Sequence, residues 1–364
     1  MSTTGPVRVI FAGGGTGGHL FPGIAVAREL MRRHPTAEVV FAGSGRDLET
    51  RVLSREGFSL ERVRAVGLVG RSPRAVLRGL AQLPAAFVDA TRVLRRHRPD
   101  VVVGLGGYSS GPVVLWAAFR HIPTLLLEQN AVPGMTNRLL SRFARAAAVS
   151  FEDTLSHFGT RGFVSGNPVR TEFFDAPPAR EELPEVHLLV IGGSQGAHAI
   201  NVAMVGVAPA IAMAAKRVHV THQSGEADLT MVRDGYRSAG LAARVEPFLD
   251  LMSVEMSKAD IVVCRAGATT LAELAAAGRP AILVPFPHAA HDHQRLNAAA
   301  VEKTGAAQVI DPDELSSAEL AGRLTALMTN DADRVALARA SRRRAMPDAA
   351  SRIVDLMDRL MGRV

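Results

Sequence analysis

Short apolar runs alternate along the chain with longer stretches in which apolar residues recur every three or four positions. Runs rich in Val, Ile, Leu and Ala are typical of strands buried on both faces of a sheet, and the longer stretches are typical of helices. The predicted strands are residues 7–12, 38–42, 101–104, 124–128, 146–150, 186–191, 217–223, 261–264 and 281–284. Strands that alternate with helices favour parallel βαβ units, so the pattern predicts an α/β protein.

The pattern begins again half-way along the chain, which indicates two domains. We expect a first Rossmann-like domain over residues 1–165 and a second over residues 185–346. Residues 166–184 are rich in proline and show little apolar periodicity, a composition that indicates a linker. A last helix is predicted over residues 348–361. Its periodicity leaves open whether the end of the chain, residues 347–364, packs on the second domain or returns to the first.

Three predicted strands run into glycine-rich loops, at residues 13–18, 106–111 and 192–196. Ligands bind at the carboxyl ends of the strands in an open α/β sheet, where glycine loops and helix N-termini present N–H groups to phosphates. One such loop has an ordinary explanation as a tight turn. The set predicts a ligand with several phosphates, or two phosphorylated ligands that meet in a cleft between two facing sheets.

The first loop leaves two other classes of protein open. Gly13, Gly15 and Gly18 satisfy the G-x-G-x-x-G pattern of NAD-binding Rossmann enzymes. The string GGGTG also occurs in tubulin-like GTP-binding proteins that polymerise. Neither class accounts for the glycine loop of the second half or for the polar residues that follow strand 261–264.

Those polar residues predict a second phosphate site. Thr269 and Thr270 fall at an expected helix start, where hydroxyl groups and unpaired N–H groups bind a diphosphate. Glu273 lies about one turn further on, and its carboxylate is suited to accept two hydrogen bonds from a ribose diol. An ordinary helix cap is the alternative. The histidines of residues 288–293 lack the spacing of zinc sites, so we expect no metal.

Composition excludes several classes of function. No apolar run is long enough for a membrane-spanning helix, and the N-terminus lacks a signal-peptide pattern, so we expect the chain to stay in the cytoplasm. The single cysteine, Cys264, excludes an internal disulfide framework. None of the three lysines follows a GxxxxG loop, which excludes a Walker A site.

The positive charge is concentrated in one stretch. The net charge is +7, and residues 61–100 hold nine arginines against three acidic residues. The motifs of zinc fingers and of aromatic base-stacking strands are absent, so we expect no nucleic-acid partner. A basic patch of this kind fits an anionic membrane surface or an anionic substrate.

Apolar residues also recur at helical spacing within this basic stretch, at Val76, Leu80, Leu83 and Phe87. Flanked by arginines, they predict a stripe that dips into a membrane interface. A helix that faces the protein core is the alternative. Pro84 predicts that any helix here is broken or begins anew near that point.

Several motifs taken together resemble one family. They are GGGTGGHLFPG, GGYSSGP, LLLEQNAVPG, SGNPVR, GGSQGA, HQSG, CRAGATTLAE and VPFPHAAHDHQRLNA. Over nearly its whole length the chain resembles the MurG-type lipid-I N-acetylglucosaminyltransferases of bacterial peptidoglycan synthesis. The resemblance implies the GT-B architecture, with two Rossmann-like parallel-sheet domains facing across a cleft.

The resemblance also implies a reaction and a location. The reaction is inverting transfer of N-acetylglucosamine from UDP-N-acetylglucosamine to the 4-hydroxyl of the muramoyl sugar of lipid I, which gives lipid II. The location is the cytoplasmic face of the cell membrane, where the protein would be peripheral and bound to an anionic surface. No cofactor is implied, and proteins of cell-wall synthesis stay open as partners.

Roles for individual residues follow from the resemblance as well. Carried over by position, the substrate-binding residues are Thr16, Gly17, Gly18, Asn130, Arg170, Ser194, Leu249, Ala268, Thr269, Thr270, Leu271, Ala272, Glu273 and Gln294. The backbone of Leu249 would read the uracil. His293 departs from the family pattern, in which a second glutamine can stand at that position.

Transfer needs a base for the acceptor hydroxyl, and two residues at predicted strand ends qualify, His19 and Glu128. We prefer His19 because an imidazole titrates near neutral pH, whereas Glu128 would need a raised pKa. Alternatively, His19 binds the acceptor's phosphate. A UDP-N-acetylglucosamine epimerase would share the fold and is the main rival, although it has no use for a basic apolar surface.

Overall fold

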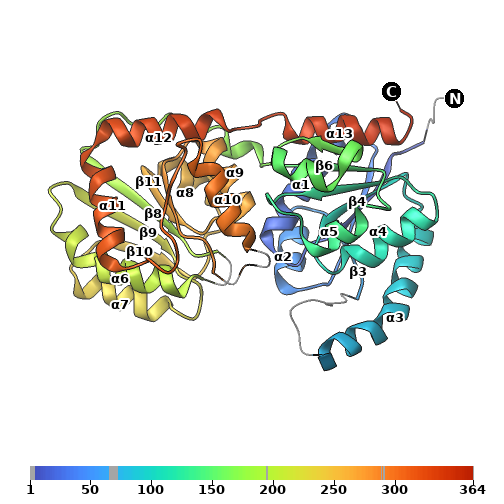
Figure 1. Cartoon of the computed structure of the whole chain (residues 1–364), viewed down its shortest axis with the longest axis horizontal. Helices are drawn as coiled ribbons and strands as arrows, with labels where there is room; N and C mark the ends of the chain where they lie inside the picture. Colours follow the sequence, from blue (N-terminus) through green and yellow to red (C-terminus); the bar gives the residue numbers. More distant parts are fainter. Residues whose placement is uncertain (1–4, 65–72, 194–195, 288, 290–291, 364) are drawn as a thin grey trace. The chain divides into compact units, whose positions relative to one another are not determined.

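A computed structural model describes residues 5–64, 73–193, 196–287, 289 and 292–363, with the backbone alone for residues 73–80. The chain divides into two compact units (Figure 1). Unit 1 comprises Met1–Arg170 and Asp348–Val364, and unit 2 comprises Thr171–Pro347. The expected linker, residues 166–184, is thus divided between the units, and most of it belongs to unit 2.

Unit 1 contains a parallel sheet with the strand order β3-β2-β1-β4-β5-β6-β7. Its strands are β1 (Arg8–Gly13), β2 (Glu38–Gly43), β3 (Ser59–Arg62), β4 (Val101–Gly106), β5 (Thr124–Glu128), β6 (Ala146–Val149) and β7 (Gly162–Val164). The helices are α1 (Gly17–Arg33), α2 (Asp47–Arg55), α3 (Pro73–His97), α4 (Ser110–Phe119), α5 (Met135–Leu140) and α13 (Ala349–Leu360). Short 3-10 helices, η1 (Glu152–His157) and η2 (Gly159–Arg161), lie between β6 and β7.

Both faces of this sheet are buried, as the continuous apolar strands predict. Val9 and Phe11 of β1 join one core cluster, and the alternating Ile10 and Ala12 join another. Successive side chains of a strand point to opposite faces, so each cluster covers one face of the sheet.

Helix α13 packs against α1 of unit 1, although more than 300 residues separate the two in sequence. Ile353, Val354 and Met357 are buried in the core cluster that also contains Phe11 of β1. At the rim, His34 Nε2 and Asp358 Oδ1 lie 2.9 Å apart. The end of the chain therefore returns to the first unit.

Unit 2 repeats the architecture with the strand order β10-β9-β8-β11-β12-β13. Its strands are β8 (Glu185–Ile191), β9 (Arg217–Gln223), β10 (Ala243–Glu246), β11 (Ile261–Cys264), β12 (Ala281–Leu283) and β13 (Gln308–Val309). The helices are α6 (His198–Ala212), α7 (Leu229–Ser238), α8 (Met252–Lys258), α9 (Ala268–Ala277), α10 (His293–Glu302), α11 (Ser317–Thr329) and α12 (Asp331–Arg343), with a 3-10 turn, η3 (Thr171–Phe173), at its start.

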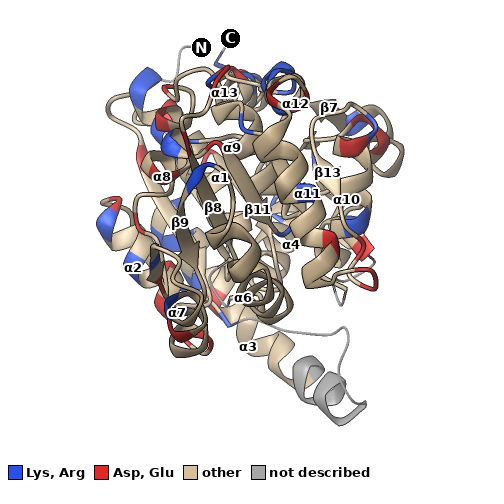
Figure 2. Cartoon of the chain, turned by 90° about the vertical axis from the view of Figure 1, so that its left-hand side faces the viewer, with Lys and Arg blue, Asp and Glu red and all other residues tan. Residues whose placement is uncertain are grey.

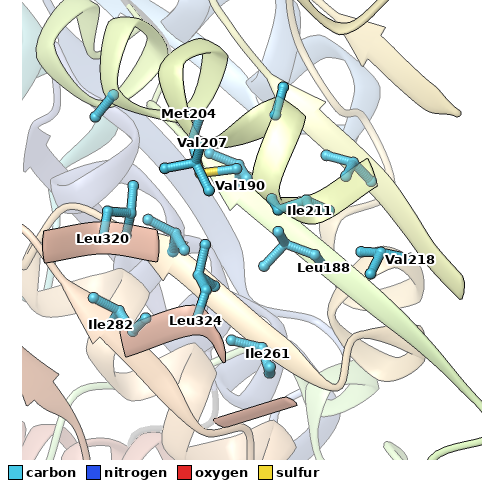
Figure 3. Packing of buried hydrophobic residues seen from close by; sticks show 14 of the residues in the cluster. Leu188, Val190, Met204, Val207, Ile211, Val218, Ile261, Ile282, Leu320 and Leu324 are labelled. Atoms are coloured by element: carbon cyan, nitrogen blue, oxygen red, sulfur yellow. The ribbon is translucent and has the colours of Figure 1, made fainter. Parts of the chain in front are cut away.

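The core of unit 2 lies between the sheet and helices α6 and α11. Leu188 and Val190 of β8 pack with Met204 and Val207 of α6 and with Leu324 of α11 (Figure 3). Charged residues gather on outer helices such as α7 and α12, whereas β11 is wholly apolar (Figure 2). The parallel sheets of the two units confirm the predicted fold class.

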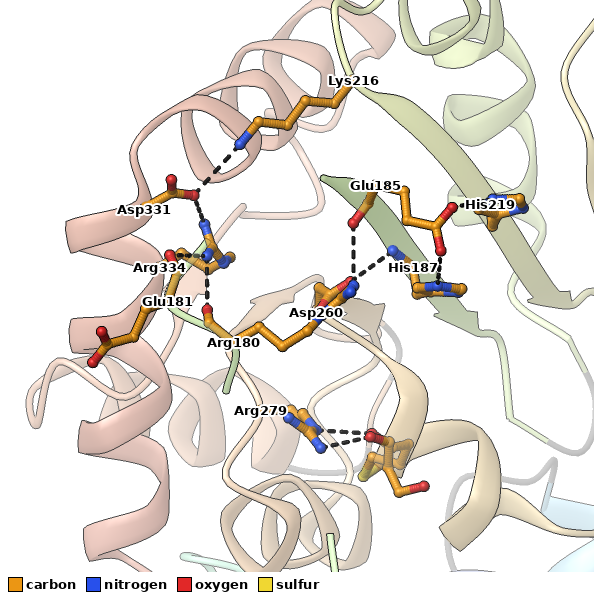
Figure 4. Close-up of polar contacts among 12 residues, drawn as sticks. Arg180, Glu181, Glu185, His187, Lys216, His219, Asp260, Arg279, Asp331 and Arg334 are labelled. Carbon is orange, nitrogen blue, oxygen red and sulfur yellow. Dashed lines mark hydrogen bonds and ion pairs between the residues drawn. The ribbon is translucent and has the colours of Figure 1, made fainter. Parts of the chain in front are cut away.

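The proline-rich segment before β8 is fastened to unit 2 by arginines (Figure 4). Arg279 donates to the carbonyl of Pro177 at 3.0 Å, and Arg334 donates to the carbonyls of Arg180 and Glu181 at 2.9 and 3.0 Å. Arg180 in turn donates to the carboxylate of Asp260, with Nε 3.0 Å from Oδ1. Guanidinium groups thus satisfy the carbonyl groups that would be paired in a helix or strand.

Three local expectations differ from the structure. Helix α1 begins at Gly17 and not near residue 21, because the last two glycines of the loop already have helical backbone angles. Helix α3 is continuous through Pro84, so the predicted break is wrong. Proline removes one hydrogen bond of the ladder, and packing of α3 on α4 compensates for that loss. The strands β3, β7, β10 and β13 were not predicted, since they are short and only partly buried.

Candidate active site

The loops after β1 and β4 touch each other at the carboxyl edge of the unit 1 sheet. The two strands are neighbours, and the strand order reverses between them. Gly13 has a φ of +122°, and a Cβ there would lie 2.3 Å from the carbonyl oxygen of Gly106. Only glycine fits this position. The crevice at such a reversal is where open α/β sheets bind their ligands.

The first turn of α1 faces this crevice with the residues that the motif analysis selected. Thr16 is the N-cap residue of α1, and Gly17, Gly18 and His19 follow it. Thr16 Oγ1 and His19 Nδ1 lie 3.1 Å apart, within hydrogen-bond distance. The N-terminus of a helix presents N–H groups and a partial positive charge, which suits a phosphate.

The imidazole of His19 lies against the β4 loop. A Cβ built on Gly106 would be 3.0 Å from His19 Cδ2 and 3.7 Å from Asn137 Nδ2. His19 and Asn137 therefore flank the same glycine, from α1 and α5. This places the imidazole beside the group of residues that surrounds Glu128.

Glu128 is 2% exposed, and both of its carboxylate oxygens are occupied. Oε1 accepts from the Asn130 backbone N–H at 3.1 Å and from the Asn130 side chain at 3.3 Å. Oε2 accepts from the Gly134 N–H at 3.0 Å and from Asn137 Nδ2 at 2.9 Å. Burial raises the pKa of Glu128, and these hydrogen bonds oppose the rise. The carboxylate fastens the loop between β5 and α5.

Arg170 is the last residue of the first segment of unit 1. Its guanidinium lies over the ring of Phe21, 4.6 Å from the centroid, and Phe21 belongs to α1. The structure thus brings Arg170 to the same helix as Thr16 and His19. A cation here is suited to an anionic ligand at the start of α1.

In unit 2, the strand order reverses between β8 and β11. Helix α9 begins just after the carboxyl end of β11. Gly267 is its N-cap, and Ala268, Thr269 and Thr270 form its first turn. Thr269, Leu271 and Glu273 are buried, whereas Ala272 is half-buried. Burial raises the pKa of Cys264 to about 12, and the nearby Glu273 carboxylate adds to the rise, so Cys264 is not a nucleophile.

Two other candidate residues of unit 2 are Leu249, in the loop after β10, and Gln294, in the first turn of α10. The Leu249 backbone N–H donates to Gln223 Oε1 at 3.0 Å, and Gln294 Oε1 accepts from the Phe286 N–H at 3.0 Å. Ser194, His288 and His291 lie outside the described residues. Among the residues that are described, no group of three or more His, Cys, Asp or Glu side chains is arranged to hold a metal ion.

Two family models match the chain. The N-terminal domain model of glycosyltransferase family 28 matches residues 9–149, and the C-terminal domain model matches residues 187–353. A protein of Anaeromyxobacter dehalogenans is 45% identical over 98% of this chain and 94% of its own length. Its name is UDP-N-acetylglucosamine--N-acetylmuramyl-(pentapeptide) pyrophosphoryl-undecaprenol N-acetylglucosamine transferase. The chain belongs to glycosyltransferase family 28.

Other members of family 28 agree with this assignment. A protein of the same name from Geotalea uraniireducens is 45% identical over 97% of this chain and 98% of its own length. A crystal structure of Acinetobacter baumannii MurG is 30% identical with a TM-score of 0.78, and the match covers 97% of this chain and 100% of that one. The resemblance predicted from the motifs is confirmed, and the NAD-binding and GTP-binding alternatives are not favoured.

The epimerase alternative shares the fold of family 28 and little more. A crystal structure of a UDP-N-acetylglucosamine 2-epimerase matches 98% of this chain with a TM-score of 0.69 at 12% identity. Identity this low shows a common architecture alone. In the part of the chain that the structure describes, no helix is long and apolar enough to cross a membrane.

Sequence reasoning missed residues that hold the loops of this family 28 site. Glu49 is 1% exposed, and its Oε2 accepts from the N–H groups of Gly45 and Arg46 at 2.6 and 3.1 Å. A Cβ on Gly14 would lie 2.7 Å from Glu49 Oε1, so Glu49 also shapes the first glycine loop. Gln223 ends β9 and was noticed only as part of a motif. The signal for Gln223 is a polar residue at the end of a buried strand, and the signal for Glu49 is an acidic residue in the first turn of a helix.

Proposed function

We propose that the protein transfers N-acetylglucosamine from UDP-N-acetylglucosamine to the 4-hydroxyl of the muramoyl sugar of lipid I, with inversion, and so forms lipid II. The observation that carries the proposal is the 45% identity, over 98% of the chain, to a relative named for this transfer. The N-termini of α1 and α9 beside the strand-order reversals of the two sheets support it, because donor and acceptor each carry a diphosphate.

The donor belongs to unit 2 in this proposal. The N-terminus of α9, with Thr269 and Thr270, receives the diphosphate together with Ser194, and Glu273 binds the ribose. Ala268, Leu271 and Ala272 belong to the same helix and are proposed to contact the donor. Gln294 is proposed to contact the sugar. Leu249 reads the uracil through its backbone. In unit 1, the proposed substrate-binding residues are Thr16, Gly17, Gly18, Asn130 and Arg170.

His19 is the proposed base for the acceptor hydroxyl. Its imidazole flanks the crevice of unit 1, and Thr16 orients one ring nitrogen. Glu128 accepts four hydrogen bonds from its own loop, so we assign it to positioning. Departure of UDP is stabilised by helix N-termini and hydroxyl groups, which supply positive potential where negative charge develops. No metal or cofactor enters the scheme.

One incubation tests the reaction. Labelled UDP-N-acetylglucosamine and a lipid-I analogue should yield a labelled disaccharide lipid and UDP, with inverted configuration at the transferred sugar. The same donor without acceptor should stay unchanged. Conversion of the donor alone to its 2-epimer, with no disaccharide lipid, would identify an epimerase and contradict the proposal.

We also propose that the protein acts at the cytoplasmic face of the membrane, bound through α3 to anionic lipid. Of the predicted stripe, Phe87 packs edge-on against Trp116 of α4, with the ring centroids 5.8 Å apart. The side chains of Val76 and Leu80 lie outside the described residues. Val88 is 57% exposed on the same helix. Arg92 lies one turn further along α3, and arginines attract anionic headgroups.

Vesicle binding tests the membrane proposal. Wild-type protein should bind vesicles that contain anionic lipid, and added salt should weaken the binding. Val88→Ser should weaken it at constant salt, whereas the control Met213→Ser, at an 87% exposed site of unit 2, should not. Equal binding by Val88→Ser and wild type would place the membrane face elsewhere.

A further inference from the structure

The side-chain amide of Gln223 joins two loops at the carboxyl edge of the unit 2 sheet. Gln223 is the last residue of β9 and is 2% exposed. Its Nε2 donates to the carbonyl of Gly193 at 2.8 Å, in the loop after β8. Its Oε1 accepts from the N–H of Leu249 at 3.0 Å, in the loop after β10. One planar group therefore sets the spacing of two loops that the chain does not connect directly.

Gln223 is itself held rigidly by its neighbours. Its carbonyl accepts from the Gly192 N–H at 3.1 Å. The residue before it, His222, is hydrogen bonded through Nδ1 to Tyr236 Oη at 2.7 Å and through Nε2 to Asn201 Oδ1 at 2.9 Å. The residue after it, Ser224, accepts a hydrogen bond at its carbonyl from Asn201 Nδ2 at 2.8 Å. With both adjoining residues fixed, the amide of Gln223 has a defined position and orientation.

We propose that Gln223 is a positioning residue that makes the donor site select uracil over cytosine. The inference rests on the proposed function, in which Leu249 reads the base. Gln223 accepts the Leu249 N–H at 3.0 Å, so in this proposal the Leu249 carbonyl is the backbone group that meets the base. A carbonyl accepts the N3–H of uracil. Cytosine has a lone pair at N3, so the same carbonyl would meet an acceptor and leave both groups unpaired.

Two substitutions of Gln223 test its two hydrogen bonds. Gln223→Glu has nearly the same shape, but its carboxylate cannot donate to the Gly193 carbonyl and places two acceptors face to face. Gln223→Met keeps the volume and removes both hydrogen bonds. Gln308→Glu on the edge strand β13 makes the same chemical change in the same sheet and serves as the matched control.

Calorimetric titration with UDP and with CDP is the first measurement, followed by steady-state kinetics with UDP-N-acetylglucosamine and a lipid-I analogue. Wild-type protein and Gln308→Glu should prefer UDP. Gln223→Glu and Gln223→Met should weaken UDP binding and raise the donor KM about tenfold, the effect of one lost hydrogen bond. The ratio of UDP to CDP affinity should fall, and kcat should change less than about threefold.

Hydrogen exchange gives a readout that does not need substrate. The Leu249 amide should be protected in wild-type protein and should exchange faster in Gln223→Met, with the rest of unit 2 unchanged. If Gln223→Glu does not fold, Gln223→Met alone tests the positioning role. If neither variant folds, Gln223 is a structural residue and the inference is wrong.

The outcomes also distinguish this inference from the proposed function. If wild-type protein does not bind UDP, the donor assignment itself fails. If wild-type protein prefers UDP and both Gln223 variants keep that preference and the wild-type donor KM, the proposed function stands and the positioning role of Gln223 is wrong.

Discussion

The two sheets present the same kind of edge to their ligands but fasten their loops with different side chains. In unit 1 the loops are held by buried carboxylates, Glu49 and Glu128, which accept backbone N–H groups. In unit 2 the loops are held by neutral side-chain amides. Gln223 and Asn297 donate to the carbonyls of Gly193 and Ala266, and Gln294 accepts from the Phe286 N–H.

This difference has a physical consequence. A carboxylate only accepts hydrogen bonds and carries charge, and burial raises the pKa of Glu128, so the loop that Glu128 holds is sensitive to pH. An amide both donates and accepts and does not titrate, so the loops of unit 2 keep their geometry over a wide range of pH. Neutral fasteners also avoid adding negative charge beside the proposed UDP site, where Glu273 is already required for the ribose.

We expect the strongest loss of activity from a change of His19, the proposed base in unit 1. His19→Ala should lower kcat by about 10²–10⁴, the usual contribution of general-base catalysis, with little change in donor affinity. His97→Ala is the control, since His97 pairs with Glu61 at 2.9 Å. A variant with normal kcat and a raised KM for lipid I would show that His19 binds the acceptor's phosphate.

Glu128→Gln tests whether this buried carboxylate fastens a loop or performs chemistry. Glutamine can accept at only one of the two oxygen positions, so two donors lose their partner and the free energy of unfolding should fall by about 2–5 kcal/mol. Urea unfolding measures this loss. A fully stable variant with a 10²–10⁴-fold loss of kcat would exchange the roles of His19 and Glu128.

The raised pKa of Glu128 adds a dependence on pH. The folded protein binds this proton more tightly than the unfolded chain, so the stabilisation is present below the ordinary pKa of 4.5 and is lost as pH rises through the folded value. Urea unfolding of the wild type across the acidic range should contain this component. The same series for Glu128→Gln should not.

Glu273→Ala addresses the one carboxylate that unit 2 places in its site. The loss of a hydrogen bond from a ribose hydroxyl to a charged group should cost about 1.5–3 kcal/mol, seen as a raised donor KM with a small change in kcat. The variant should also discriminate less between UDP and 2′-deoxy-UDP. Glu319→Ala on α11 is the control. Retained preference for the ribose would remove Glu273 from the donor site.

His222 is a buried titratable group of unit 2, and its protonation should make the stability of this unit depend on pH. Burial lowers the pKa of His222 from 6.5 to about 3, so the folded protein keeps the imidazole neutral. Its stabilisation is present above pH 6.5 and is lost as pH falls towards 3. Between pH 6.5 and pH 5 the free energy of unfolding should fall by about 2 kcal/mol.

A variant isolates this contribution. His222→Gln should fold with a lower free energy of unfolding and should lack the component lost between pH 6.5 and pH 5. Urea unfolding at several pH values provides the comparison. An unchanged pH dependence in the variant would mean that another group titrates with the unfolding of unit 2.

The smallest expected effect is that of a chelator. If helix N-termini and hydroxyl groups suffice for the departing UDP, EDTA should leave kcat and the donor KM unchanged. Assays with and without EDTA, followed by added magnesium, check this. A loss of activity that magnesium restores would show that the proposed stabilisation by helix ends is insufficient.

The elements predicted from the sequence were those with a strong local signal. Strands β5 and β11 have the predicted bounds because a buried parallel strand is a continuous apolar run with a clear end. Strand β9 also has the predicted bounds, and its buried valines alternate with more exposed residues, which is the period of a strand. The edge strands β3 and β13 were missed because edge positions are half exposed and carry mixed residues. The start of α1 was missed because glycine is typical of loops and disfavours a helix interior.

Strand periodicity and glycine spacing are local properties, so the alternation of strands and helices, the family, and the residues at the carboxyl edges could be predicted from the sequence. Only the tertiary structure decided that α13 packs on α1, that Glu128 is occupied by its own loop, and that Gln223 joins Gly193 to Leu249. These contacts join segments that are distant in the chain, and the energy that selects them comes from burial and hydrogen bonding between those segments, which leaves no periodic signal in either one.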